Sequence, residues 1–160
     1  MKLKAIPFLL VLLFSIQFTN AQYQELDIKN LHFDNSKPVR IFFTALWCSP
    51  CMGKYKMVQK EFSEDTSFNN MVLIDALGFS RQKLEKIAGQ PFDSLRSYLL
   101  PARFYKTKGP IAVNLPRKAL SRFLDELKKK YPGSKLDGFW FGDILLISPE
   151  GQISIKKIKV

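Results

Sequence analysis

Two cysteines three residues apart are the side chains of this sequence best suited to chemistry. Cys48 and Cys51 enclose Ser49 and Pro50, and Trp47 precedes them. In the first turn of a helix, positions i and i+3 lie on one side, so the two sulfurs could close a disulfide. A disulfide across so short a loop removes little entropy from the unfolded chain, so stabilisation of the fold is a poor reason for it.

The two cysteines are expected to have different roles. Cys48 falls at the predicted helix start, where free amide groups and the helix dipole favour an anion. The thiolate is the species that attacks a disulfide. Cys51 would lie one turn further in, less exposed and suited to resolving a mixed disulfide. This spacing predicts thiol–disulfide exchange.

The residues around the cysteines predict a strand, a helix and a second strand. Residues 39–46 are rich in β-branched and aromatic side chains and predict a central strand buried on both faces. Residues 52–62 repeat apolar side chains at helical spacing, and Pro50 is tolerated in a first turn. Residues 71–76 predict a second buried strand. Together they form a βαβ unit.

The middle of the chain is mostly helical in pattern. Capping side chains predict one helix over residues 80–89 and another over residues 93–100. Residues 103–115 are ambiguous, with a small hairpin as one option. Residues 117–130 predict the clearest helix, whose apolar stripe is expected to pack in the core.

The two ends of the predicted domain are extended. A short strand is expected at residues 26–28. Residues 143–147 and 153–155 are apolar or alternating, and the Ser-Pro-Glu-Gly turn at 148–151 lies between them. These segments predict a C-terminal hairpin.

Residues 1–21 are typical of a signal peptide. Two lysines precede an apolar stretch over residues 5–18, and a small residue ends the segment, so cleavage is expected before Gln22. The alternative is an uncleaved membrane anchor, but about fourteen apolar residues are fewer than the roughly twenty that span a bilayer. We therefore expect an exported, periplasmic or secreted protein with no transmembrane segment after cleavage. Residues 22–160 would form a single domain.

Composition narrows the function classes. The 160 residues are 46% hydrophobic and 24% charged, with a net charge of +11, which fits one globular domain. Two cysteines and one histidine exclude a zinc site of four nitrogen or sulfur ligands. Lysine runs at 128–130 and 156–159 are typical of solvated faces, although attraction to acidic partners or an anionic membrane stays open. Nucleic acid is not expected as a partner, because no binding motif is present.

The order of strand, Trp47-Cys48-Ser49-Pro50-Cys51, helix, strand and hairpin resembles the thioredoxin-like superfamily of thiol–disulfide oxidoreductases. The resemblance covers roughly residues 39–88 and 139–159. It implies an α/β fold, a three-layer sandwich with a central mixed sheet. Relative to that family, we expect a helical insertion at about 90–135 and no C-terminal helix after the hairpin.

The resemblance assigns roles to the motif. Cys48 matches the exposed nucleophile, Cys51 the resolving cysteine, Trp47 the flanking tryptophan, and Ser49-Pro50 the dipeptide that tunes the redox potential. No organic cofactor and no metal are implied, because the cysteine pair itself carries two electrons. The implied partners are protein thiols or disulfides and a redox partner protein. The direction of exchange stays open.

Some positions depart from the family pattern. Phe42 occupies the place of a buried acid, and Lys54 the place of an acid three residues after the second cysteine. A cation at Lys54 would stabilise the Cys48 thiolate; the alternative is that it points to solvent. The family's last helix is missing after the hairpin, and the helix over residues 117–130 could cover that face of the sheet instead.

The cis-proline of the family has no clear counterpart. Alignment on the strand at 143–147 places Gly142 there, with Pro110 as the rival. A glycine would let a substrate backbone approach. Phe139, Trp140 and Phe141 precede it; they are expected either to hold unfolded or hydrophobic polypeptide or to pack in the core.

Two other function classes remain open at this point. The first is a metallochaperone that binds Cu(I) through the two thiolates, with Met52 as the nearest further ligand. The second is a thioredoxin-fold interaction module in which the inserted region matters more than the cysteines. Cu(I) titration and a Cys48→Ser variant, respectively, would separate them from the redox reading.

Overall fold

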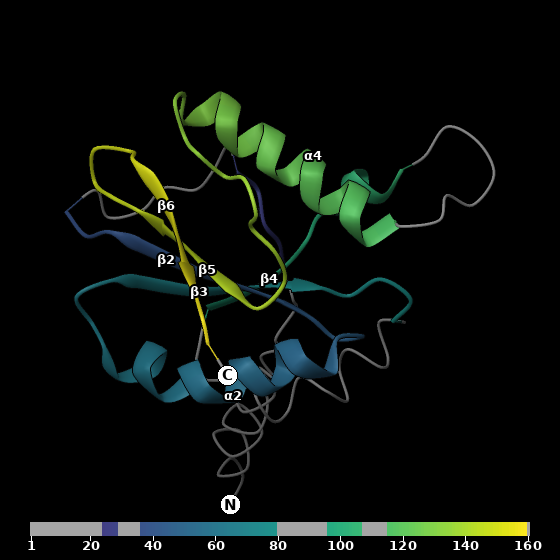
Figure 1. Cartoon of the computed structure of the whole chain (residues 1–160), viewed down its shortest axis with the longest axis horizontal. Helices are drawn as coiled ribbons and strands as arrows, with labels where there is room; N and C mark the ends of the chain where they lie inside the picture. The colour runs from purple at the N-terminus through teal and green to yellow at the C-terminus, as the bar shows by residue number, and fades with distance from the viewer. Residues whose placement is uncertain (1–23, 29–35, 80–95, 107–114, 160) are drawn as a thin grey trace, which may run out of the picture.

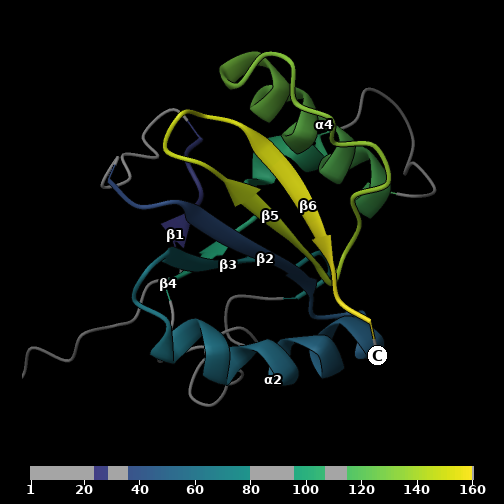
Figure 2. The ribbon, with the colours of Figure 1, turned by 60° about the vertical axis from the view of Figure 1, so that its left-hand side comes forward.

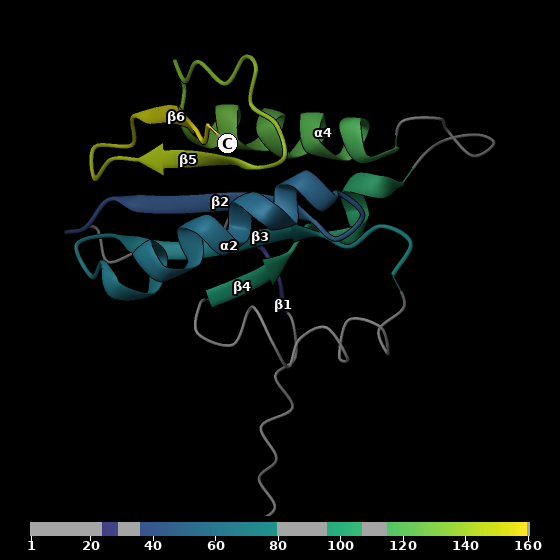
Figure 3. The ribbon, with the colours of Figure 1, turned by 60° about the horizontal axis from the view of Figure 1, so that its bottom comes forward.

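The protein is organised around one mixed β-sheet. The computed structural model describes residues 24–28, 36–79, 96–106 and 115–159. Over these ranges six strands lie in the order β1-β4-β3-β2-β5-β6, which can be followed in Figure 3. The predicted signal peptide (1–21) and the predicted helix at 80–89 fall outside the described residues.

The central strand separates a parallel half of the sheet from an antiparallel half. The strands are β1 (Gln24–Glu25), β2 (Val39–Ala45), β3 (Asn69–Asp75), β4 (Arg96–Leu99), β5 (Asp143–Ile147) and β6 (Ile153–Lys157). β2 pairs in parallel with β3, β3 with β4, and β4 with β1. On its other side β2 pairs antiparallel with β5, and β5 pairs antiparallel with β6.

Two helices cover opposite faces of this sheet. Figures 1 and 2 show α2 (Ser49–Glu64) on one side and α4 (Leu115–Lys130) on the other. Every residue of β2 is buried, because side chains of both faces are covered. Phe42 packs with residues of α2, and Phe43 stacks on Phe123 of α4 with ring centroids 6.1 Å apart. The result is the expected three-layer sandwich.

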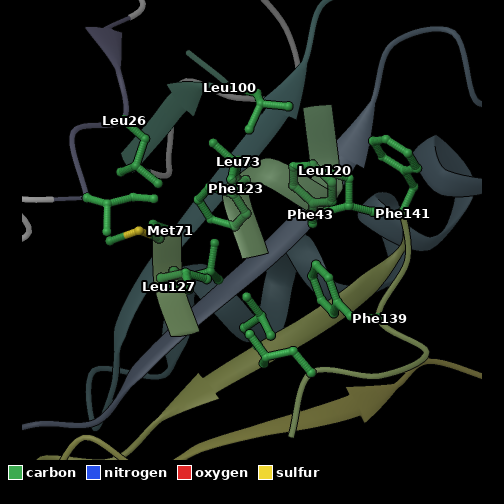
Figure 4. Packing of buried hydrophobic residues seen from close by; sticks show 14 of the residues in the cluster. Leu26, Phe43, Met71, Leu73, Leu100, Leu120, Phe123, Leu127, Phe139 and Phe141 are labelled. Atoms are coloured by element: carbon green, nitrogen blue, oxygen red, sulfur yellow. The ribbon is translucent and has the colours of Figure 1, made fainter. Parts of the chain in front are cut away.

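Most of the core lies between the sheet and α4. Figure 4 shows Leu73, Phe123, Leu120 and Phe43 converging there, with Phe139 approaching from the loop before β5. Both cysteines pack against this cluster, Cys51 as a buried member and Cys48 as a partly buried one. The larger core therefore adjoins the cysteine pair.

The βαβ unit, the helix at 117–130 and the hairpin are confirmed. The helix begins two residues earlier than predicted, at Leu115, and its apolar stripe is buried. It covers the sheet face opposite α2. Pro50 lies in the first turn of α2, where its missing N–H costs no helical hydrogen bond.

The helix predicted over residues 93–100 is wrong, because residues 96–99 form strand β4. Tyr98 lies opposite Leu73 of β3 and opposite Gln24 of β1. Strand pairing on both sides outweighs the local capping signal. The region between β3 and β5 is therefore not purely helical.

Two shorter segments also differ from expectation. The N-terminal strand is Gln24–Glu25 rather than residues 26–28, although Leu26 and Ile28 are buried. In place of a hairpin, Ala102–Tyr105 form a short 3₁₀-helix, η1, while residues 107–114 fall outside the described ranges. Within the described part of the chain, no helix has the length and apolar character needed to cross a bilayer.

A buried cation joins the start of the central strand to the end of α2. The Arg40 guanidinium forms ion pairs with Glu61 at 2.7 Å and Asp65 at 2.9 Å. Its Nε donates to Asn70 Oδ1 at 2.7 Å, and its plane lies over the Phe68 ring. The pKa of Asp65 is lowered, first by hydrogen bonds from Ser67 and then by Arg40.

Candidate active site

The disulfide between Cys48 and Cys51 lies at the junction between the end of β2 and the start of α2. Cys48 is the N-cap of α2, and the two Cα atoms are 5.3 Å apart. The Cys48 N–H donates to the carbonyl of Ala45 at 3.0 Å, which closes the turn after the strand. The Cys51 N–H donates to Cys48 Sγ at 3.3 Å. The predicted pair at a helix start is confirmed.

The two sulfurs differ in accessibility. Cys48 is half-buried, whereas Cys51 is 4% exposed. Ser49 and Pro50, between them, are exposed, so the outer edge of the disulfide faces solvent. No acidic side chain lies in the first turn of α2, so the helix itself carries no carboxylate there that would offset its dipole.

Two exposed tryptophans contact Phe141, and one of them, Trp47, directly precedes Cys48. Trp47 and Trp140 are each 44% exposed. Both meet Phe141 edge-on, with ring centroids 4.9 and 5.2 Å from it. Phe141 is itself buried and stacks on Phe43 at 4.7 Å. Phe139 is buried too, so of the three aromatic residues before Gly142 only Trp140 offers an open surface.

A buried carboxylate holds the loop that carries Trp140. Asp143 Oδ2 accepts a hydrogen bond from the backbone N–H of Trp140 at 2.7 Å and another from the Lys157 ammonium at 2.5 Å. Lys157 also donates to the carbonyl of Gly138. Sequence reasoning missed this pair, although an aspartate at the start of an otherwise apolar strand was its available signal.

Gly142 lies against α2. Its φ is +87°, and its N–H donates to the Phe43 carbonyl at 2.6 Å. A Cβ added here would stand 2.9 Å from Lys54 Cδ. Lys54 therefore lies along the loop before β5 rather than wholly in solvent. The described residues contain no cis peptide bond, and Pro110, the rival for the family's proline position, is outside them.

A second buried carboxylate, Asp75, lies at the end of β3. It is fully buried, opposite Ala45 in the register. Burial raises its pKa, and the interactions that oppose the rise come from Tyr105, the Leu77 N–H and the Trp47 side chain. The motif analysis overlooked it; the signal was an aspartate closing the run Met-Val-Leu-Ile-Asp.

The residues described do not form a metal centre of three or more histidine, cysteine, aspartate or glutamate side chains. Met52, considered as a Cu(I) ligand, accepts a hydrogen bond from Thr44 Oγ1 at 3.6 Å. It packs against the cluster on the α2 side of the sheet, whereas the cysteines pack against the cluster on the α4 side. Met52 is thus engaged away from the sulfurs.

The topology and the site together define a class of protein. A central strand leads into a helix that begins with a CxxC disulfide, a parallel strand follows, and an antiparallel hairpin lies on the other side of the central strand. This is the thioredoxin-like fold, with β4 added between β3 and β1. The chain has a thioredoxin-like fold, and its disulfide is consistent with thiol–disulfide exchange.

Comparison with known proteins gives similar folds at low sequence identity. The exposed lipoprotein thioredoxin Etrx1 of Streptococcus pneumoniae strain TIGR4 aligns with a TM-score of 0.49 and 14% identity, over 79% of this chain and 78% of that one. DsbF of MTB gives 0.47 and 10%, over 78% and 72%. The N-terminal domain of PilB from Neisseria gonorrhoeae gives 0.45 and 18%, over 78% and 69%. No family model and no curated sequence matches the chain.

Proposed function

We propose that this protein is an exported thiol–disulfide oxidoreductase that exchanges its Cys48–Cys51 disulfide with protein thiols. The observation that supports this most strongly is the geometry of Cys48. Cys48 is partly exposed, and its sulfur caps α2 and accepts the Cys51 N–H. An anion on that sulfur is stabilised by the hydrogen bond and by the helix dipole, so Cys48 is a good leaving group and a good nucleophile.

In the oxidising direction, a substrate thiolate attacks Cys48 Sγ. The Cys48–Cys51 bond breaks, a bond between Cys48 and the substrate forms, and Cys51 leaves as a thiolate that takes up a proton. A second substrate thiolate then attacks the substrate sulfur of this mixed disulfide and releases the Cys48 thiolate. Two electrons have passed from substrate to the cysteine pair. The reducing direction reverses these steps, with Cys51 resolving the mixed disulfide.

The surface around the disulfide fits an extended polypeptide. Trp47 and Trp140 provide exposed aromatic area on either side of the buried Phe141. Gly142 adds no side chain between the loop and α2, and the Lys54 side chain lies in the space beside it, so a substrate backbone could approach there only if Lys54 moves aside. Lys54, which lies beside Gly142, supplies a cation that favours a thiolate at the site.

The compartment belongs to the same proposal. Cleavage of residues 1–21 would release residues 22–160 into the periplasm or the exterior, where a disulfide can persist. A redox partner protein would there restore the cysteine pair. The pair at Cys48 and Cys51 serves as its own redox centre, without an organic cofactor or a metal.

The proposal is tested by trapping the mixed disulfide. Cys51→Ala leaves Cys48 without its resolving partner, so incubation with a peptide that contains one disulfide should give a stable, dithiothreitol-sensitive adduct by mass spectrometry. Cys48→Ala is the matched control and should give little adduct, because Cys51 is buried. An adduct-free Cys51→Ala protein that is folded would contradict the proposal.

A further inference from the structure

The Asp75 carboxylate accepts a hydrogen bond from a residue outside the βαβ unit, Tyr105. Asp75 Oδ1 accepts the Tyr105 hydroxyl at 2.6 Å and the Leu77 N–H at 2.9 Å. Its other oxygen, Oδ2, is buried and has no hydrogen-bond partner among the described residues. A buried carboxylate oxygen without a partner is costly. Such a group is more often retained for a role than for stability.

Asp75 also adjoins the turn that carries the cysteines. Its backbone carbonyl accepts the Leu46 N–H at 3.0 Å, and it lies opposite Ala45, whose carbonyl accepts the Cys48 N–H. The Trp47 side chain lies close enough to lower the pKa of the carboxyl. Through both its backbone and its side chain, Asp75 therefore touches the segment between β2 and Cys48.

Tyr105 is fixed by its own surroundings. It ends η1, and the neighbouring Phe104 meets Phe123 of α4 edge-on at 6.1 Å. Arg122 of α4 donates to the carbonyls of Phe104 and Lys106, each at 2.6 Å. Tyr105 is thus held by η1, which packs against α4, and its hydroxyl contacts Asp75 from the region between β3 and β5.

Within the described residues, Glu25 is the one further ionisable group whose charge raises the pKa of Tyr105. Burial and the adjacent Asp75 raise the pKa of Tyr105, with a smaller contribution from Glu25 of β1. Glu25 accepts the Ala102 N–H at 3.0 Å. On α4, the cation of Arg122 is directed at the carbonyls of Phe104 and Lys106. Among the described residues, Asp75 is a buried carboxylate that the strand register places beside the turn leading to Cys48.

We propose that Tyr105 is a positioning residue of the cysteine site: its hydroxyl holds the Asp75 carboxylate beside the Trp47–Cys48 turn, so that the inserted region governs how readily the Cys48 thiolate forms. The inference rests on the proposed thiol chemistry and gives part of the region at 90–135 a role in it. A carboxylate kept ionised near the thiolate opposes the second negative charge. Loss of the Tyr105 hydrogen bond makes the carboxylate easier to protonate and removes that opposition.

The test is the pH profile of Cys48 alkylation by iodoacetamide in the reduced full chain, between pH 4 and 10. In wild type, ionisation of Asp75 should produce an inflection in the plot of alkylation rate against pH, and Tyr105→Phe should shift that inflection to higher pH. In the pH range where Asp75 is ionised in wild type, Tyr105→Phe should speed alkylation severalfold. Asp75→Asn should remove that inflection, and adding Tyr105→Phe to it should change nothing further. Tyr131→Phe, which removes the hydroxyl of another half-buried tyrosine, is the matched control and should leave the profile unchanged.

The outcomes are decisive for this inference alone. A folded Tyr105→Phe protein whose profile superimposes on wild type would overturn it, as would an undiminished Tyr105→Phe effect in the Asp75→Asn background. Circular dichroism checks that each variant is folded. Alkylation needs no protein substrate, so a failure to trap mixed disulfides would count against the proposed function without deciding the Tyr105 inference.

Discussion

The Cys51 amide points at the sulfur of Cys48 across 3.3 Å, so the resolving residue of the pair also supports the attacking one. This contact exists because Cys48 is the N-cap of α2 and Cys51 is its third helical residue. N-cap acceptors are commonly oxygen atoms; here a sulfur takes that place.

Alkylation of the reduced protein should be strongly selective. At pH 7 we expect iodoacetamide to modify Cys48 at least about tenfold faster than Cys51, because only Cys48 combines access with a stabilised thiolate. Peptide mapping by mass spectrometry measures the two rates. In urea both cysteines should react alike; equal rates in the folded protein would contradict the assignment of roles.

Gly142→Ala should destabilise the protein by about 1–2 kcal/mol, because an L-residue is strained at positive φ. Gly78→Ala is the matched control, with φ of +80° and open space around an added Cβ. Adding Lys54→Ala to Gly142→Ala should restore part of the lost stability, because Lys54 Cδ stands 2.9 Å from the added Cβ. Adding Lys54→Ala to Gly78→Ala should restore none. Urea unfolding measures the stability of each glycine variant with and without Lys54→Ala. If Lys54→Ala had the same effect on both glycine variants, the contact between Lys54 and position 142 would be contradicted.

Asp75→Asn should change how stability depends on pH. Burial raises the pKa of Asp75 above its ordinary value of 3.8, so the folded state holds this proton more tightly than the unfolded state. The contribution of Asp75 to stability is therefore fully present below pH 3.8 and is lost as pH rises through the folded pKa. As pH rises from 3.8 through the folded pKa of Asp75, the unfolding free energy of Asp75→Asn should therefore increase relative to that of wild type. A difference that stays flat from pH 3 to 9 would refute this.

Arg40→Ala should cost about 2 kcal/mol, because it removes a buried cation with its hydrogen bonds, while Glu61 and Asp65, which lose their positive partner, are partly exposed and can be solvated. The exposed pair between Lys60 and Glu64, at 4.0 Å, offers the comparison. Lys60→Ala should cost less than about 0.5 kcal/mol, as surface pairs usually do. Chemical denaturation of the two variants measures the contrast; similar losses would mean that Arg40 acts as a surface charge.

Local sequence patterns were sufficient for the elements that carry the cysteines. The run at 39–46 predicts a strand buried on both faces, the apolar repeat at 52–62 predicts a helix, and the Cys48–Cys51 spacing predicts that both sulfurs lie at the start of that helix. These features depend on near neighbours in the chain. Hydrophobic periodicity and helix-end chemistry therefore predict them directly.

Contacts between distant segments were decided only by the tertiary structure. Residues 96–99 carry no strand signal of their own and became β4 by pairing between β3 and β1. Asp75 and Tyr105 are 30 residues apart, yet share a hydrogen bond. Of the three aromatic residues at 139–141, Phe139 and Phe141 are buried and Trp140 is exposed. Burial and long-range pairing depend on which segments the sheet brings together, and no local pattern encodes that.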